Sequence, residues 1–190
     1  MKLSSILITF NEEKHIEAAL ESVPFSDEII VVDSGSTDKT IPLARKYTDK
    51  IFHRDFDHFS AQKNYALSLA AHPWILSLDA DERISEPLKR EIQEVIKEPE
   101  STYLAYAIPR TNFIFGKPLR YGLNKDDAPI RLFLKEKAMF YGAIHEKVQV
   151  SGKVGRLTHD ILHYSTETVA DYVRKLNHYS APLTCFITLS

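Results

Sequence analysis

The sequence predicts an α/β fold in which a mostly parallel β-sheet is flanked by helices and becomes mixed in the second half of the chain. Through the first 100 residues, short apolar runs rich in strand-forming residues alternate with amphipathic helical patterns. This alternation is typical of right-handed βαβ units, which place parallel strands in one sheet. After residue 100, strand-like runs follow one another without a helical pattern between them. Such an order indicates a mixed sheet.

The first strand and helix are predicted from a buried apolar run followed by a helical repeat. Residues 3–10 form the run, and Asn11 follows it as the expected helix N-cap, a position that asparagine favours. Apolar side chains then recur at i, i+3, i+4 and i+7, which places them on one helical face. These side chains are Ile16, Ala19, Leu20 and Val23.

Further strands and helices complete the first half. Residues 28–33 are a β-branched run that ends in a carboxylate, and a turn at 34–38 leads into a helix that runs to about Tyr47. Residues 50–55, 60–71 and 74–78 are predicted as strand, helix and strand. Ser85 is then expected to cap a helix that ends before Pro99, because serine favours the N-cap and proline cannot continue a helix.

The second half is predicted to hold mainly strands. Strands are expected at 103–110 and 130–135, and strands or strand–loop segments at 139–150 and 156–164. The segment 112–123 is predicted as an aromatic and basic loop that could hold an acceptor, pack against the domain or form an oligomer contact. A last helix is expected to open at Ser165 or Thr166, and Pro182 should end or kink it.

Composition and charge exclude several kinds of protein. The chain has 190 residues, of which 44% are hydrophobic, as expected for a single globular domain over residues 1–190. Its net charge of −2 gives no basis for binding a nucleic acid. Cys185 is the only cysteine, so an internal disulfide is not expected, which fits a reducing cytosol. The first residues do not resemble a signal peptide, and no run of about 18 apolar residues predicts a membrane span.

Two carboxylates follow one predicted strand with a single residue between them. In an extended chain, side chains at i and i+2 point the same way, so Asp79 and Asp81 can aim at one point. An oxygen-rich site of this kind suits Mg²⁺ or Mn²⁺, whereas the alternative is a polar strand end followed by a turn. Thr9, Asn11 and Asp33 follow the ends of other strands. Because ligands of parallel sheets gather at the carboxyl ends of the strands, a common site is predicted there.

Four short motifs stand in order along the first half. They are Ile8-Thr-Phe-Asn-Glu12, Val31-Val-Asp-Ser-Gly-Ser-Thr-Asp38, Gln62-Lys-Asn64 and Leu78-Asp-Ala-Asp81. Together they resemble glycosyltransferase family 2, whose members have the Rossmann-like GT-A fold and bind nucleotide sugars. In the second half, Pro129-Ile-Arg-Leu-Phe133, Gly142-Ala-Ile-His-Glu146 and His163 are similar to the branch that contains lipopolysaccharide-core glucosyltransferases.

The resemblance implies a role for each residue that matches a family motif. The nucleoside pocket would be lined by Thr9, Asn11 and Glu12, and Asp33 would accept a hydrogen bond from the base. Lys63 and Asn64 would lie at the nucleotide. Asp79 would lie near the ribose and the metal, and Asp81 would be the main metal ligand. Lys63 stands where the family often has arginine. The implied cofactor is Mg²⁺ or Mn²⁺, which would stabilise the charge of the departing nucleoside diphosphate as a Lewis acid.

Candidate residues of the second half each have an alternative. Glu146 is the best match for the catalytic base that the acceptor hydroxyl needs, and otherwise it is a surface carboxylate. His163 is a candidate additional metal ligand or a structural histidine, and His145 could position the substrate. Arg131 is expected near the diphosphate, which an arginine fork suits, or else it is a solvated strand residue.

The predicted function is that of an inverting, metal-dependent glycosyltransferase. It would move glucose from UDP-glucose to the lipopolysaccharide inner core at the cytoplasmic face of the membrane, with residues 1–100 binding the donor and residues 101–190 the acceptor. The related enzymes continue beyond this length, so the acceptor half could be shortened. Alternatives are transfer to another glycan, a lipid phosphate or a protein side chain, or a nucleotide-binding module without catalysis. A Rossmann dehydrogenase is disfavoured because no Gly-x-Gly-x-x-Gly follows the first strand.

Overall fold

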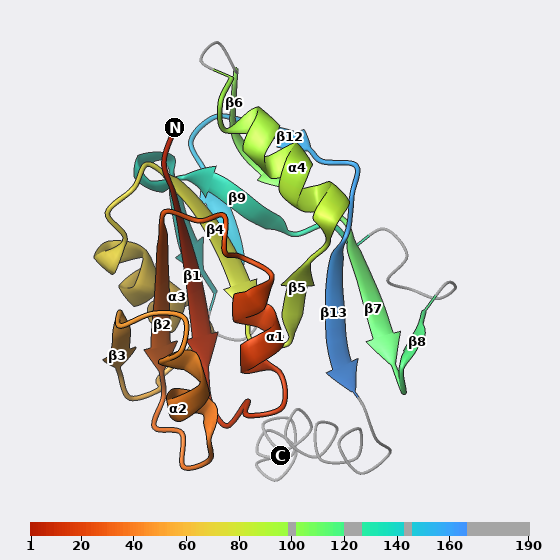
Figure 1. The fold of residues 1–190 in the computed structure, drawn as a ribbon. Coiled ribbons are helices and arrows are strands. Elements are labelled where there is room, and N and C mark those ends of the chain that lie inside the picture. Colours follow the sequence, from red (N-terminus) through yellow and green to blue (C-terminus); the bar gives the residue numbers. More distant parts are fainter. Residues whose placement is uncertain (99–101, 120–126, 143–145, 167–190) are drawn as a thin grey trace, which may run out of the picture.

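The computed structural model describes residues 1–98, 102–119, 127–142 and 146–166. The central sheet has seven strands in the order β12–β6–β9–β4–β1–β2–β3 (Figure 1). Their bounds are Leu3–Thr9 for β1, Glu28–Asp33 for β2, Ile51–His53 for β3, Trp74–Asp79 for β4, Tyr103–Ala107 for β6, Ile130–Leu134 for β9 and Lys153–Arg156 for β12. Strands β1 to β4 are parallel, whereas β9 is antiparallel to both β4 and β6. This confirms the predicted change from a parallel to a mixed sheet.

Two smaller sheets and four α-helices complete the described fold. The second sheet has the order β5–β13–β7–β8, and β10 pairs with β11. The bounds are Glu82–Ile84 for β5, Arg110–Ile114 for β7, Lys117–Pro118 for β8, Ala138–Tyr141 for β10, Lys147–Val150 for β11 and Ile161–Thr166 for β13. The helices are α1 (Ile16–Glu21), α2 (Thr40–Ala44), α3 (Phe59–Leu69) and α4 (Glu86–Val95), with a 3₁₀ turn at Lys135–Lys137.

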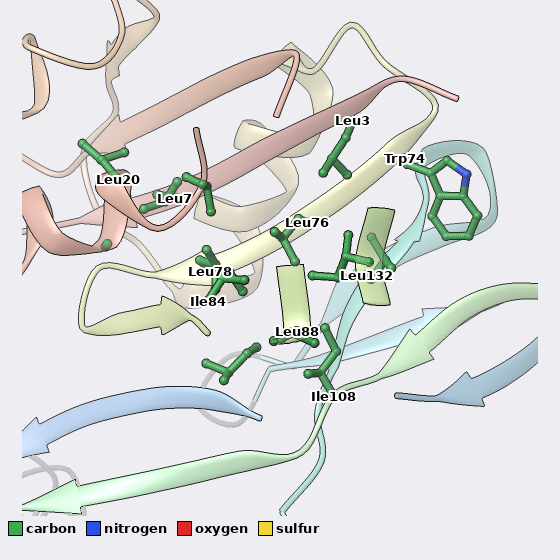
Figure 2. Close-up of a cluster of buried hydrophobic side chains, with 14 of the residues drawn as sticks. Leu3, Leu7, Leu20, Trp74, Leu76, Leu78, Ile84, Leu88, Ile108 and Leu132 are labelled. Carbon is green, nitrogen blue, oxygen red and sulfur yellow. The ribbon is translucent and has the colours of Figure 1, made fainter. Parts of the chain in front are cut away.

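Side chains of the central strands alternate between two apolar layers. Leu76 and Leu78 of β4 belong to one cluster with α1 and α4, which Figure 2 shows together with Leu3 and Leu7. Ile75 belongs to the other cluster, where α3 packs. Because successive side chains of a strand point to opposite faces, Asp79 leaves β4 on the α3 face. Each fully buried leucine or isoleucine stabilises this arrangement by about 1.5–3 kcal/mol.

The helix expected after Asn11 begins later than predicted. Helix α1 starts at Ile16, and Asn11 has a φ of +53°, so it does not act as the N-cap. Its side-chain Oδ1 accepts a hydrogen bond from the backbone N–H of Thr37 at 2.8 Å instead. The N-cap prediction was therefore wrong, because the asparagine is used to join two loops. By contrast, Ser85 caps α4 as predicted, accepting from Leu88 N at 3.4 Å.

Strand boundaries in the second half differ from the prediction where side-chain patterns were read as continuous. The predicted strand 103–110 is two strands, β6 and β7, which are separated at Ile108 and Pro109 and belong to different sheets. Part of the predicted loop 112–123 continues β7 and forms β8, with Gly116 at a φ of +72° in the turn between them. Strand β13 includes Ser165 and Thr166, where the last helix was predicted to open, and the remaining residues of that predicted helix lie outside the described residues.

Candidate functional site

The carboxyl ends of three central strands lie at one edge of the sheet. In the strand register, Thr9 of β1 is paired with Asp33 of β2, and Ile8 is paired with Asp79 of β4. Two strand spacings, about 10 Å, therefore separate the backbones of the two acidic residues. Strand alternation directs Asp79 towards α3 and Asp33 towards the opposite face. The two carboxylates share an edge of the sheet without sharing a partner.

Asp33 is held by the turn that follows β2. Its Oδ2 accepts from the backbone N–H groups of Gly35 and Ser36, each at 2.9 Å, and its Oδ1 accepts from the Ser36 hydroxyl at 2.5 Å. The same Ser36 hydroxyl accepts from the N–H of Asn11, and Glu12 N–H donates to Thr40 Oγ1 at 2.7 Å. These bonds join the loop after β1 to the loop after β2.

Thr9 carries a polar atom that the described residues leave without a hydrogen bond. Its hydroxyl is buried, and no partner for Oγ1 occurs in the part of the chain that the structure describes. An unsatisfied buried hydroxyl costs about 1–3 kcal/mol. Thr9 is paired with Asp33 in the strand register, so this unsatisfied hydroxyl belongs to a residue at the carboxyl edge of the sheet.

Lys63 is a buried cation that joins the two halves of the chain. It lies on α3, its side chain is 2% exposed, and its Nζ lies 2.8 Å from Asp79 Oδ1 and 2.6 Å from Glu146 Oε1. Glu146, which is predicted as the base, is thus brought to the end of β4 although it is 83 residues from Lys63 in the sequence. The sequence alone gave no sign that this lysine is buried.

Arg131 binds Asp79 from the other side. Its Nη2 lies 2.5 Å from Asp79 Oδ2 and 2.7 Å from Glu82 Oε1. Burial by itself would raise the pKa of Asp79, but the charges of Arg131 and Lys63 outweigh it and hold this pKa well below its usual range. Burial would lower the pKa of Arg131, yet Asp79 and Glu82 raise it above its usual value. Asp79 is therefore ionised and held by two cations.

Glu82 is a buried residue of this site that sequence reasoning missed. It is 0% exposed, and its carboxylate accepts from the backbone N–H of Asp79 at 3.0 Å and contacts Arg131 and Arg110. Arg110 in turn forms an ion pair with Asp127. Acidic and basic groups thus alternate in one contact series, which we call the rim charge chain. In order, it consists of Glu146, Lys63, Asp79, Arg131, Glu82, Arg110 and Asp127.

Asp81 and His163 form a separate pair beside the rim charge chain. His163 Nδ1 lies 2.6 Å from Asn112 Oδ1, and Nε2 lies 3.3 Å from Asp81 Oδ2. The Asn112 oxygen only accepts, so Nδ1 donates in this pair. Nε2 lies opposite the Asp81 carboxylate oxygen at a separation of about 3 Å, which two neighbouring ligands of one cation also have. The pair therefore fits a divalent metal ion.

Metal binding here would depend on a ligand for further oxygens. Among the described residues, no three histidine, cysteine or acidic side chains converge on one point. Mg²⁺ commonly uses only one or two protein carboxylates together with substrate phosphates, so this does not conflict with the fit of Asp81 and His163. Both Asp79 oxygens contact cations of the protein. His145 lies outside the described residues.

Asn64 serves the fold rather than the edge of the sheet in this structure. Its Nδ2 donates to Phe140 O at 2.8 Å, and its Oδ1 accepts from Phe140 N–H at 2.9 Å. The amide thus bonds β10 to α3 in the manner of a neighbouring strand. A hollow of about 610 Å³ lies near the amino ends of β2 and β3, and no predicted site residue lines it.

Comparison with known proteins gives the family. The profile described as Glycosyl transferase family 2 matches residues 4–155. The chain belongs to this family. An uncharacterised glycosyltransferase of Rickettsia conorii is 33% identical over 94% of the chain and 68% of its own length. The lipopolysaccharide core biosynthesis glycosyltransferase LpsC of Rhizobium meliloti is 28% identical over 95% of the chain and 69% of its own length. The family 2 chain thus spans about two thirds of the length of these curated relatives.

Solved structures of the same fold confirm the predicted GT-A architecture of this family 2 chain. TarS of S. aureus, solved in complex with UDP-GlcNAc, superposes with a TM-score of 0.62 at 19% identity, over 90% of the chain and 61% of TarS. Glucosyl-3-phosphoglycerate synthase from Mycobacterium tuberculosis, in complex with Mg²⁺ and UDP, gives a TM-score of 0.61 at 14% identity, over 90% of the chain and 74% of that enzyme. None of the helices in the described ranges has the length and apolar character that a membrane crossing requires.

Proposed function

We propose that this family 2 chain binds a nucleoside diphosphate sugar at the carboxyl edge of its sheet and transfers the sugar with inversion to a glycan. The observation that carries the proposal is the contact of Glu146 with Lys63, whose ammonium also contacts Asp79. A candidate base from the second half and a candidate donor-binding carboxylate from the first half are therefore held on one side chain. Such a meeting is what a reaction between a donor and an acceptor needs.

The charges at this edge suit a diphosphate. Lys63 and Arg131 lie beside each other on Asp79, and Arg110 follows through Glu82. Arginine forks and lysine ammonium groups are the usual partners of phosphate oxygens. Preorganised cations stabilise negative charge that develops on a leaving group, because they need no reorganisation during the reaction. We therefore assign the diphosphate to the Lys63–Arg131 side of the edge.

The nucleoside is assigned to the neighbouring loops. Thr9, Asn11 and Glu12 follow β1, and hydrogen bonds join their loop to the turn that holds Asp33. The unsatisfied hydroxyl of Thr9 supports this assignment because a ligand group could complete its hydrogen bonding. The Asp33 carboxylate keeps acceptor capacity beyond its three bonds, since an ionised carboxylate has about four lone-pair sites.

Asp81 and His163 would hold the divalent cation, which supplies Lewis-acid stabilisation of the departing diphosphate when it is bound. Asn112 Oδ1 accepts from His163 Nδ1 and orients the ring, so that Nε2 is directed at Asp81. Asp79 then has a different role from Asp81. It keeps Lys63 and Arg131 together at the edge, although the two aspartates are one residue apart.

In the proposed reaction, the acceptor oxygen forms a bond to the anomeric carbon of the sugar. The bond from that carbon to the diphosphate oxygen breaks, and the electron pair leaves with the diphosphate. The acceptor proton moves to the Glu146 carboxylate, because an alcohol is a weak nucleophile near neutral pH without a base. Attack from the face opposite the leaving group inverts the anomeric configuration.

The finer specificity is proposed from the relatives. TarS was solved with UDP-GlcNAc and the mycobacterial synthase with UDP and Mg²⁺, which favours a UDP sugar with Mg²⁺ or Mn²⁺. LpsC, named for lipopolysaccharide core biosynthesis, favours an inner-core acceptor, and with it a place at the cytoplasmic face of a membrane. We propose UDP-glucose as the donor within this class.

The test replaces the proposed base without changing its shape. In Glu146→Gln, binding of UDP measured calorimetrically with Mn²⁺ should persist, whereas sugar release from UDP-glucose or transfer to core-truncated lipopolysaccharide should fall by about 10²–10⁴-fold. Glu136→Gln, at an exposed position, is the matched control and should turn over normally. Near-normal turnover by Glu146→Gln would exclude the base. UDP binding by the unmodified protein without release of sugar from any UDP sugar would favour a silent nucleotide-binding module.

A further inference from the structure

We propose that Lys63 is a positioning residue for which the donor diphosphate and the Glu146 carboxylate compete, so that donor binding frees the base. This inference rests on the proposed function and adds a coupling between its two parts. It starts from the contacts of a single ammonium group, which lies 2.8 Å from Asp79 and 2.6 Å from Glu146. No motif comparison indicated that these two acidic groups share a cation.

The surroundings of Lys63 restrict where its charge can be. The side chain is 2% exposed, α3 packs against the central sheet, and Nζ lies 5.8 Å from the centre of the Phe140 ring. Asn64, the next residue, is bonded to both backbone groups of Phe140. Because the methylene chain of Lys63 is packed and the helix is anchored, Nζ stays close to the carboxylates of both Asp79 and Glu146. An anion that binds this lysine must therefore bind beside these two carboxylates.

The limited access to Lys63 makes the competition specific. The ammonium is buried and two of its three donors are directed at the carboxylates of Asp79 and Glu146, so a diphosphate can approach Nζ only by taking the place of one of them. Asp79 is also held by Arg131, so it keeps a cation if Lys63 turns to another anion. Within the described ranges, Lys63 is the cation whose ion pair with Glu146 the structure shows. When a diphosphate pairs with Lys63, Glu146 therefore loses its ion pair, whereas Asp79 keeps one with Arg131.

The consequence for the reaction follows from the contact of Glu146 with Lys63. The Glu146 Oε1 atom accepts a hydrogen bond from the Lys63 ammonium at 2.6 Å, so this oxygen is occupied by the cation. When the diphosphate engages Nζ, this hydrogen bond is given up, and the carboxylate oxygen can accept the proton of the acceptor hydroxyl. The oxygen would then be free only after the donor is in place. The order of binding, donor before acceptor, is a result of this contact.

The experiment measures UDP affinity by calorimetry with Mn²⁺ in four proteins: unmodified, Glu146→Gln, Lys63→Met and the double variant. Removal of the competing carboxylate should tighten UDP binding by about five-fold in Glu146→Gln, the scale of one charge pair. Lys63→Met should weaken UDP binding by about ten-fold. In the Lys63→Met background, Glu146→Gln should bring no gain, because the shared cation is gone.

Two further variants keep the result decisive if Lys63→Met folds poorly. Lys63→Arg retains the charge, so Glu146→Gln should still tighten UDP binding in that background. Lys50→Met removes a lysine that pairs with buried Glu28 at the other end of the sheet, and it should leave UDP affinity unchanged. The inference is overturned if Glu146→Gln tightens UDP binding in the Lys63→Met background as well, or if it does not tighten UDP binding while Lys63 is present. In both cases UDP binding itself would still support the proposed function. An unmodified protein that does not bind UDP overturns both.

Discussion

Buried acidic residues lie at both ends of the central sheet, and their partners differ. At the amino end, the Glu28 carboxylate accepts from the Ser4 hydroxyl at 2.5 Å and from Ala71 N–H at 2.8 Å, and it pairs with Lys50, whose side chain is 55% exposed. At the carboxyl end, Glu82 lies between two arginines of the rim charge chain. The first carboxylate has mainly neutral donors, whereas the second contacts two arginines besides the Asp79 N–H.

This difference indicates which end serves the fold alone. Neutral donors and one surface lysine suffice to hold a buried carboxylate, and at the amino end they join β1, β2 and the segment after α3. A series of seven alternating charges gives the same stability only at a larger desolvation cost, because each buried ion must be removed from water. Its position at the edge where ligands of parallel sheets bind gives the extra charges a use.

The largest expected effect comes from neutralising the two buried glutamates in turn. Glu82→Gln leaves Arg131 and Arg110 without their shared anion and should lower the free energy of unfolding by about 3–5 kcal/mol. Glu28→Gln keeps an acceptor for its neutral donors and loses only the charge, so it should cost less, about 1–3 kcal/mol. Urea unfolding at pH 7 measures both. Equal losses in the two variants would remove the proposed distinction between the ends of the sheet.

Lowering the pH should reveal the contribution of Glu28, at the amino end of the sheet, to the free energy of unfolding. Although burial opposes it, hydrogen bonds from Ala71, Lys50 and Ser4 lower the pKa of Glu28 to about 2, below its ordinary value of 4.5. A lowered folded-state pKa stabilises the protein above the unfolded-state value, and this contribution is lost as the pH falls from about 4.5 to about 2. It amounts to at most about 3 kcal/mol. Denaturant midpoints between pH 6 and pH 2 should fall less in Glu28→Gln than in the unmodified protein.

The smallest expected effect concerns the pair beside the rim charge chain. His163→Ala removes one of two proposed metal ligands and should weaken Mn²⁺ binding in the presence of UDP by about ten-fold. His159, an exposed histidine that pairs with Glu91 on α4, is the matched control, and His159→Ala should leave the affinity unchanged. Calorimetric titration with Mn²⁺ measures both. An unchanged affinity in His163→Ala would assign His163 a structural role beside Asn112.

Local patterns predicted the strands and caps that depend on neighbouring residues. The run 28–33 became β2 with the predicted bounds, and Ser85 caps α4, because both depend on residues close in sequence. Asn11 failed as a cap because Thr37, 26 residues away, uses its side chain. The break at Pro109 was missed because one strand was predicted across this proline to Arg110, whereas the two strands on either side of it enter different sheets.

The candidate site was predicted in its residue types but not in its contacts. The motifs singled out Lys63, Asp79 and Arg131 separately, and their ion pairs join residues that are far apart in sequence. Arg131 and Glu82, for example, are 49 residues apart. Glu82 follows the Asp-x-Asp motif directly, yet a glutamate after a strand usually lies in solvent. Its burial depends on two arginines that only the folded chain brings to it.

The amide bonds of Asn64 have a mechanical consequence. Because Asn64 follows Lys63 on α3, two adjacent side chains fix both the backbone of Phe140 and the carboxylate of Glu146. Phe140 and Glu146 are therefore both positioned by neighbouring residues of one helix. An insertion or deletion between these two residues should move the carboxylate away from its cation.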